Sequence, residues 1–181
     1  KTLTGSGPDT WNHDHTPFGV SDLCGNIWEW FAGLRLINGV LQFIPNNDAA
    51  ADIDLSADSD KWQTMLADEK SICIDATEGI RFTNDGEEID GEGEYDGCEW
   101  EDAEFGFEIT EEMKELGLFP GEPKAYLYAD TDGERLPLAG GGWTDGANAG
   151  VFYLDFGYPR SSSSSLFGFR SAFYRNLNSE I

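Results

Sequence analysis

Glycine limits the folds open to this chain more than any other residue type. The 181 residues include 22 glycines, together with 12 phenylalanines, six tryptophans and six tyrosines. So many glycines imply frequent turns and close backbone approaches, which long helices do not provide. The aromatic side chains, within a hydrophobic fraction of 39%, can fill one core. We therefore expect one folded, loop-rich domain over residues 1–181, with an α+β or mostly β structure.

The charge of the chain excludes several kinds of partner. With 35 acidic and 11 basic residues, the formal net charge is −24, which repels phosphate backbones and anionic lipids, so we expect no nucleic-acid partner. The sequence shows neither an apolar run of about 18 residues nor a charged-then-apolar start, so we expect no membrane insertion and see no signal peptide. Because the sequence does not begin with Met, we expect Lys1 to lie inside a longer gene product, with an N-terminal part of the domain missing.

The cysteines favour a reduced protein. Cys24, Cys73 and Cys98 are widely spaced, with no C-x-x-C pair and no histidine at zinc-ligand spacing. One disulfide with a leftover thiol and three buried thiols both fit this pattern. The odd count favours thiols.

Two polar segments resemble fragments of metal sites. His13-Asp14-His15 sets two imidazoles one residue apart in a polar loop, where they are more often solvent-exposed than metal-bound. Asp130-Thr131-Asp132-Gly133-Glu134 resembles part of a calcium loop but lacks the EF-hand frame and its closing glutamate. We predict no cofactor, and a structural calcium ion stays an open alternative without assigned ligands.

Asn38-Gly39 predicts a β-hairpin. The strand-like segment 25–30 alternates its side chains, and Leu34 to Ile37 then precedes the Asn-Gly pair. Asn-Gly readily adopts the two positive φ values of a type I′ turn, and Val40 to Ile44 supplies the returning strand before Pro45 ends it.

Acidic residues crowd the stretch 46–117, where apolar residues thin out. Two patches favour helices: 59–67, with three apolar side chains on one face, and 110–116, where Thr110 resembles an N-cap and Gly117 a stop. The segment 85–97 combines seven carboxylates with four glycines, and we expect it to be mobile. We interpret 46–117 as an acidic insertion that decorates the fold.

After Pro120 the chain is again rich in glycine and aromatic residues. Ala125 to Tyr128 predicts a strand, and Asp132-Gly133 a turn. Farther along, two apolar segments, 149–154 and 166–173, bracket a polar loop with five serines. A serine run alone is typical of a flexible linker, but the aromatic segments on both sides favour a loop within the domain.

Three segments, in order along the chain, carry a resemblance to a known family: Gly25-Asn26-Ile27-Trp28-Glu29-Trp30, Gly140-Gly141-Gly142-Trp143 and Gly168-Phe169-Arg170-Ser171-Ala172. Together they resemble the hallmark segments of the formylglycine-generating-enzyme (sulfatase-modifying factor) type of C-type lectin fold. Within that superfamily the chain is most similar to the variable proteins of diversity-generating retroelements, through 146–152 and Arg160-Ser161. The resemblance covers about 5–44 and 118–175, and it implies an α+β, C-type-lectin-like fold.

The resemblance also implies a variable, ligand-binding region at 140–175. In that family, copying errors at template adenines change selected codons and produce massive sequence variation. The candidate variable positions are Gly142, Thr144, Asp145, Tyr153, Asp155, Phe156, Gly157, Tyr158, Ser162, Ser164, Ser165, Leu166 and Phe167, of which Phe156 and Phe167 are the weaker candidates.

Such a scheme separates a constant framework from a changeable surface. We expect Trp143, Val151, Leu154, Phe169 and Arg170 to hold the backbone through core packing and buried hydrogen bonds, while the candidate side chains project outward. Tyrosine and serine suit such a surface, as they do an antibody paratope. The alternative is that the aromatic candidates are core residues, as we expect for the tryptophans of the segment 25–30.

By this resemblance the protein is a non-enzymatic receptor-binding protein on a phage tail or cell surface, oligomeric or virion-attached, whose partner is an unknown protein or glycan on a target cell. A formylglycine-generating oxidase is disfavoured because no cysteine follows Cys98 and Ser171 stands where that family has cysteine. A calcium-dependent sugar lectin is disfavoured because Glu122-Pro123-Lys124 replaces the calcium-binding amide with a cation. A structural or decorative surface protein without a diversified site is the main alternative.

Overall fold

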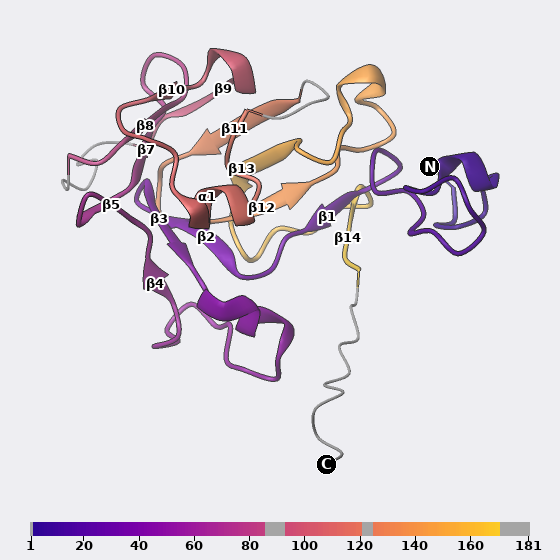
Figure 1. Ribbon diagram of the computed structural model, residues 1–181, viewed down its shortest axis with the longest axis horizontal. Helices are drawn as coiled ribbons and strands as arrows, with labels where there is room; N and C mark the ends of the chain where they lie inside the picture. Colours follow the sequence, from indigo (N-terminus) through magenta and orange to yellow (C-terminus); the bar gives the residue numbers. More distant parts are fainter. Residues whose placement is uncertain (1, 86–92, 121–124, 171–181) are drawn as a thin grey trace.

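The computed structural model describes residues 2–85, 93–120 and 125–170. Over these residues the protein is mostly sheet and rich in loops, with one short α-helix, and the main sheet curls into a half-barrel (Figure 1). The N-terminal segment lies to one side of this sheet, next to β1 and the glycine-rich loop that follows β12. The expectation of a loop-rich, mostly β or α+β fold is met at this coarse level.

Twelve strands of the described chain form the main sheet, in the order β10-β8-β7-β3-β2-β12-β13-β11-β9, with β1, β4 and β14 attached beside this path. These strands are β1 (Trp28–Trp30), β2 (Leu34–Ile37), β3 (Val40–Phe43), β4 (Gln63–Thr64), β7 (Cys73–Asp75), β8 (Arg81–Thr83), β9 (Tyr95–Glu99), β10 (Glu104–Phe105), β11 (Tyr126–Asp130), β12 (Glu134–Ala139), β13 (Leu154–Tyr158) and β14 (Phe167–Gly168). A separate hairpin pairs β5 (Leu66–Ala67) with β6 (Lys70–Ser71). The helical elements are α1 (Glu111–Glu115), η1 (Asp9–Trp11), η2 (Pro45–Ala50), η3 (Trp100–Asp102) and η4 (Gly146–Asn148).

The predicted hairpin is confirmed. Strands β2 and β3 pair antiparallel with Ile37 opposite Val40, and the two turn residues have positive φ, 47° at Asn38 and 79° at Gly39. The returning strand ends at Phe43, two residues before Pro45 opens η2. Local turn chemistry alone sets this register.

One predicted helix is confirmed and the other is wrong. At α1, the Thr110 hydroxyl accepts a hydrogen bond from the Met113 backbone N–H at 3.2 Å, and Gly117 follows with φ +74°. The segment 59–67 forms no helix, since part of it pairs with β3 as β4 and its last two residues form β5. A patch of about nine residues is too short to be stable as an isolated helix, so pairing with an existing strand prevails.

The strand and turn predicted after Pro120 are confirmed with small shifts in their bounds. Strand β11 runs from Tyr126 to Asp130, and Gly133 has φ +64° in the turn that leads to β12. The Gly133 N–H donates to the side chain of Asn38 at 3.1 Å, so this turn lies beside the hairpin turn.

The acidic stretch does not merely decorate the fold. It supplies β4 and β7–β10 of the main sheet, and its sparse apolar side chains Met65, Ile72, Phe82, Trp100 and Met113 are all at most 2% exposed. The Trp100 indole N–H donates to the Phe152 carbonyl at 2.7 Å, which ties this stretch to the C-terminal region. Acidic side chains populate the surface here, but the few apolar ones still form the core, so the interpretation as an external decoration is wrong.

The segment expected to be mobile falls largely on residues 86–92, which lie outside the described residues. For Tyr95 to Gly97 the expectation is wrong, because these residues belong to β9. This strand pairs antiparallel with β11 over five residue pairs, from Tyr95 opposite Asp130 to Glu99 opposite Tyr126.

The core lies inside the curl of the sheet and includes the tryptophan predicted for it at 28. All three cysteines carry thiols, as the odd count favoured, with Cys24 exposed, Cys73 buried and Cys98 half-buried, so the thiols are not all buried. Among the described residues we find no helix with the length and apolar character that a membrane span needs.

Candidate functional site

The three segments that carry the resemblance lie against one another in the structure. The Gly25 N–H donates to the Gly140 carbonyl at 2.8 Å, and the Trp143 N–H donates to the Asn26 carbonyl at 3.1 Å. Strand β14 pairs parallel with β1, with Gly168 opposite Glu29. Segments more than 100 positions apart in the sequence thus form one small structural unit; Ser171 and Ala172 of the third segment lie outside the described residues.

Two glycines make this contact possible. Gly140 and Gly141 have φ of +90° and +77°, a region that side-chain-bearing residues rarely adopt. A Cβ atom at Gly140 would lie only 2.9 Å from the Leu23 carbonyl oxygen. The backbone of the loop after β12 can therefore approach the N-terminal segment only with glycine at this position.

The thirteen candidate positions separate into three groups by exposure. Three of them are exposed: Thr144, Ser164 and Ser165. Six are half-buried: Asp145, Gly157, Tyr158, Ser162, Leu166 and Phe167. Four are buried: Gly142, Tyr153, Asp155 and Phe156.

For the four buried positions the expectation of an outward-facing side chain is wrong. Strand β13 lies between β12 and β11, which pair with both of its edges, and consecutive residues Leu154, Asp155 and Phe156 are buried, so both of its faces are covered. Phe156 points into the core and is 0% exposed, whereas Tyr153 packs edge-on against Trp28 with ring centroids 4.5 Å apart. A Cβ atom at Gly142 would lie 3.2 Å from the Trp28 ring, so a larger residue there would be crowded.

Three residues that were predicted to hold the backbone through core packing are exposed instead. Trp143, Val151 and Phe169 were expected in the core but are 55%, 46% and 79% exposed. Leu154, by contrast, is buried as expected. The aromatic and aliphatic side chains of this region that can meet a ligand therefore include residues that pattern analysis assigned to the core.

The serine loop between β13 and β14 is held at both ends by arginine pairs. Before the loop, the Arg160 guanidinium donates to both carboxylate oxygens of Glu134, at 2.8 and 2.9 Å. After it, Arg170 donates to both carboxylate oxygens of Glu29, at 2.8 and 3.0 Å. Both pairs are bidentate, which adds geometric restraint to the Coulomb attraction. The loop is therefore anchored and is not a linker.

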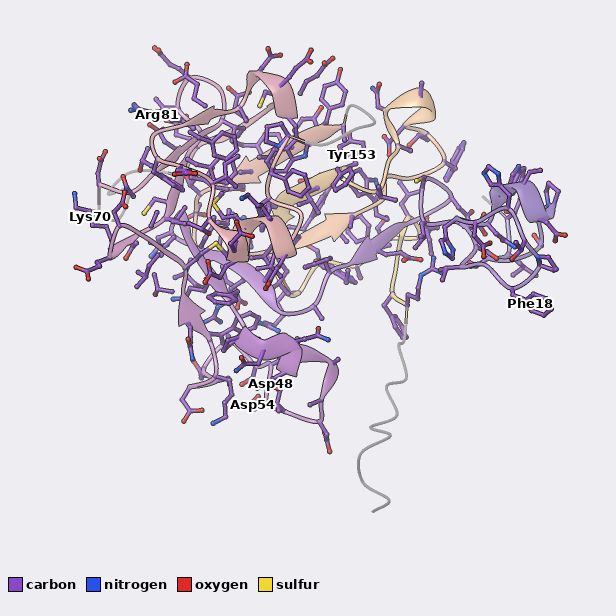
Figure 2. All side chains as sticks on the ribbon, in the orientation of Figure 1. Phe18, Asp48, Asp54, Lys70, Arg81 and Tyr153 are labelled. Atoms are coloured by element: carbon purple, nitrogen blue, oxygen red, sulfur yellow. The ribbon has the colours of Figure 1, made fainter. Side chains whose placement is uncertain are left out.

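Three tyrosines of the neighbouring strands form a row on the outer face of the sheet. Near-parallel rings follow one another from Tyr95 to Tyr128 to Tyr126, with centroids 6.1 and 6.2 Å apart. Tyr153 adjoins this row, 5.9 Å from the Tyr126 ring and 6.1 Å from the Tyr128 ring, and Figure 2 shows where it lies in the molecule. The row lies over β9 and β11, outside the predicted variable region.

Asp155 gives this face an unusual electrostatic character. Asp155 is 7% exposed, and burial raises the pKa of its carboxyl group to about 6, although a hydrogen bond from the Gly157 N–H opposes the rise. The negative charge of Asp145 raises it further. Burial and the charge of Asp155 in turn raise the pKa of Tyr95 to about 12. These are features of a desolvated site that holds carboxylates and aromatic rings.

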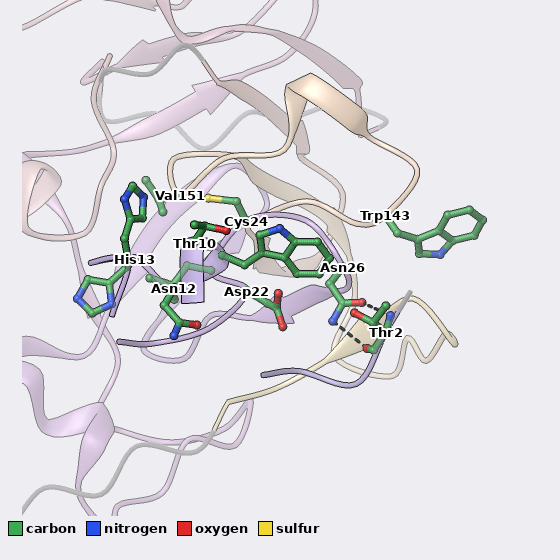
Figure 3. A pocket seen from close by; sticks show the side chains of 12 residues that line it. Thr2, Thr10, Asn12, His13, Asp22, Cys24, Asn26, Trp143 and Val151 are labelled. Carbon is green, nitrogen blue, oxygen red and sulfur yellow. Dashed lines mark hydrogen bonds between the residues drawn. The ribbon is translucent and has the colours of Figure 1, made fainter. Parts of the chain in front are cut away.

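An open pocket of about 860 Å³ lies between the N-terminal segment and the loop after β12 (Figure 3). Its walls include Trp11 and Trp143, which are 54% and 55% exposed. Cys24 also lines the pocket, but desolvation raises the pKa of its thiol, so the thiol is poorly activated as a nucleophile. The pocket is suited to hold an apolar or aromatic group of a ligand.

Two histidines, His13 and His15, line this pocket, and the His13 side chain has a structural contact. His13 Nδ1 accepts a hydrogen bond from the Val20 N–H at 2.8 Å, and Asp14 accepts from both the backbone and the hydroxyl of Thr16. Over the described ranges no group of three His, Cys, Asp or Glu side chains is arranged to hold a metal ion. The structure thus assigns no ligands to the calcium ion left open above.

Sequence reasoning missed the tyrosine row and the exposed Trp11. The signal for the row was present, since Ala125-Tyr126-Leu127-Tyr128 alternates large aromatic side chains on one face of a predicted strand. Tyr95 could not be found in this way, because it was assigned to a mobile acidic segment. The pairing of β9 with β11 places it beside Tyr128.

Comparison with known proteins gives no match to any family model or to any curated sequence.

Proposed function

We propose that this protein is a non-enzymatic ligand-binding protein of the retroelement-diversified kind, with a variable surface on a C-type-lectin-like scaffold. Its partner is a protein or glycan on a target cell, and the protein is mounted on a phage tail or a cell surface. The convergence of the three hallmark-like segments supports this assignment. Their resemblance was noted from sequence alone, and the contacts between Gly25 and Gly140 and between Glu29 and Gly168 join them.

The observation that carries the proposal is the anchoring of the serine loop. Ser161, Ser164 and Ser165 are exposed, while the restraints on the loop come from Glu134, Glu29 and the pairing of β14 with β1. These restraints lie outside the exposed serine side chains; within the loop, the Ser164 hydroxyl accepts a hydrogen bond from the Leu166 N–H at 3.1 Å. Such a loop can change its surface chemistry without changing its fold, which is what a diversified binding surface requires.

The exposure of the candidates favours a smaller variable set than the sequence suggested. Gly142, Tyr153, Asp155 and Phe156 are unsuited to free variation because their neighbours leave no room. Gly157 is also crowded, because a Cβ there would lie 2.8 Å from Asp155 Oδ1 and 3.0 Å from the Tyr95 ring. The remaining candidates are Thr144, Asp145, Tyr158, Ser162, Ser164, Ser165, Leu166 and Phe167. A small, shallow surface of this kind binds weakly, and repetition on an oligomer or virion raises the effective affinity.

The buried candidates also favour the second function, a structural or decorative surface protein without a diversified site. If positions such as Phe156 had been diversified, many of the resulting chains would not fold. The two functions can be distinguished in the DNA, because only the diversified protein requires a template copy of its variable segment.

The first test is to sequence the DNA around the gene and look for a near-identical second copy of the segment encoding 140–175. Mismatches confined to template adenines, at codons of the eight remaining candidates, support the proposal. The absence of a copy, or mismatches at any base, supports the decorative protein instead. Mismatches at the Phe156 codon would contradict the reduced set.

The second test measures directly which positions tolerate substitution. One library randomises Thr144, Ser162, Ser164 and Ser165 in surface-displayed protein, and a matched library randomises Gly142, Tyr153, Asp155 and Phe156. Resistance to protease reports the folded fraction of each. We expect most members of the first library and few members of the second to fold. Equal folded fractions would show that the anchored loop is not the tolerant region.

A further inference from the structure

The tyrosine row, with its near-parallel rings, forms an aromatic platform on an acidic protein. The Tyr128 ring lies directly over Gly97, where an added Cβ would sit only 2.1 Å from a ring carbon. The Tyr95 ring and the Asp155 carboxylate both lie next to Gly157, since a Cβ there would be 3.0 Å from the ring and 2.8 Å from Asp155 Oδ1. The platform and this carboxylate thus belong to one site.

Carboxylates occupy both ends of the row. At the Tyr95 end lies Asp155, with the charge of Asp145 close enough to act on it. At the other end, the Tyr126 hydroxyl donates to Glu99 Oε1 at 3.1 Å. Among the described residues no lysine or arginine forms an ion pair with Asp155 or Asp145, whereas Asp130 beside them is paired with Arg135 at 2.9 Å. At the Tyr95 end, Asp155 and Asp145 therefore carry negative charge that no described lysine or arginine neutralises through an ion pair.

This combination selects the chemistry of an occupant. A guanidinium group is planar, stacks on aromatic faces and donates two parallel hydrogen bonds to a carboxylate. An ammonium group can make the charge interaction but not the planar stacking. Phosphates and acidic sugars are repelled by the local carboxylates and by the net charge of −24.

We propose that the platform of Tyr95, Tyr128 and Tyr126, together with Asp155, binds an arginine side chain of a partner protein. The guanidinium stacks on the Tyr95 and Tyr128 rings and donates to the Asp155 carboxylate. This inference rests on the proposed binding function and names the chemistry of the partner. It also gives the buried Asp155 a role, since a desolvated carboxylate strengthens its interaction with an arriving cation.

The test uses blocked arginine, N-acetyl-arginine amide, titrated into the 15N-labelled full chain at low salt and followed by NMR. The control ligand is N-acetyl-citrulline amide, which has the same shape without the charge. We expect saturable shifts of the Gly97 and Gly157 amides with arginine, at a dissociation constant in the range of about 1–10 mM. Citrulline should bind at least about tenfold more weakly.

Matched variants separate the platform from general charge attraction. Tyr128→Leu should weaken arginine binding about fivefold, and Tyr128→Phe should leave it within about twofold, because the ring face is kept. Asp155→Asn removes one charge from the site and should weaken binding about fivefold. Asp52→Asn removes one charge from an exposed position in another segment and should have no measurable effect.

The inference is overturned by equal losses in Asp155→Asn and Asp52→Asn, by shifts at amides away from β9 and β13, or by equal binding of citrulline. If Tyr128→Leu does not fold, Tyr128→Phe and Asp155→Asn still decide the outcome. A failed titration ends the arginine assignment alone. The diversified-binding proposal depends on the DNA comparison and the two libraries.

Discussion

Strand β13 and the serine loop that follows it were expected to behave alike, yet they occupy opposite environments. Asp155 and Phe156 of β13 are at most 7% exposed, whereas Ser164 and Ser165 in the loop are exposed. The strand is enclosed by β12 and β11 at its edges, by the core on one face and by Tyr95 and the Asp145 loop on the other. The loop is anchored at its ends by the Arg160–Glu134 and Arg170–Glu29 pairs.

The comparison teaches that closeness to a binding surface in sequence does not make a residue free to vary. Alternation along a strand exposes every second side chain only when one face of the sheet is solvated. On β13 both faces are covered, so alternation directs side chains into two different buried environments. The predictions below test whether this difference between strand and loop controls stability and binding.

The largest effect should come from truncating Phe156. Phe156→Ala removes a fully buried ring from the core, and we expect the free energy of unfolding to fall by about 3–5 kcal/mol. Urea unfolding, monitored by tryptophan fluorescence, measures this free energy. The loop control Ser164→Ala should change stability by less than about 0.5 kcal/mol. A loss of unfolding free energy below about 1 kcal/mol for Phe156→Ala would contradict the difference between strand and loop.

Asp155 should make stability depend on pH. Its pKa is raised to about 6 in the folded protein from an ordinary 3.8, so the stability it contributes is fully present below pH 3.8 and is lost as pH rises through 6. Asp155→Asn should therefore be more stable than the wild type at pH 8, by up to about 3 kcal/mol. At pH 5 the stability difference between Asp155→Asn and the wild type should be smaller. Urea titrations of both proteins at the two pH values measure this difference. An advantage that is independent of pH would show that Asp155 is not desolvated.

A smaller effect is expected at the loop anchors. Arg160→Ala and Arg170→Ala each remove a bidentate pair between partly exposed side chains, and each should cost about 1 kcal/mol or less. Amide hydrogen exchange over 161–167 should accelerate, because the loop ends lose their restraint. Lys61→Ala, which breaks an exposed pair with Asp60, should leave exchange in this loop unchanged. If Lys61→Ala accelerates exchange in this loop as much as the two arginine substitutions do, the anchors have no special role.

The smallest effect should come from enlarging the loop side chains. Ser164→Tyr and Ser165→Tyr place rings in solvent and should change stability by less than about 0.5 kcal/mol. The matched change on β13 is Gly157→Ala, where the new Cβ would meet Asp155 Oδ1 at 2.8 Å and the Tyr95 ring at 3.0 Å. Thermal unfolding should show a clear loss for Gly157→Ala only. Equal losses would mean that the loop is packed.

Local features of the fold were predictable because their causes are local. Asn38-Gly39 specifies a hairpin turn through backbone φ preferences, and Thr110 caps α1 with its own hydroxyl. The loop-rich, mostly sheet character followed from the glycine and aromatic content. The candidate site was only partly predictable. The sequence identified the serine loop, but it predicted Trp143 in the core and Phe156 on the surface, which is the reverse of what the structure shows.

The sequence by itself determined the turns, the helix cap, the strong negative charge and the positions of the three hallmark-like segments. Only the tertiary structure decided which faces of β13 are buried, that β9 brings Tyr95 beside Tyr128, and that the acidic stretch helps to form the core. The reason is physical. Turn and cap preferences depend on neighbouring residues, whereas burial depends on which distant strands and loops cover a side chain.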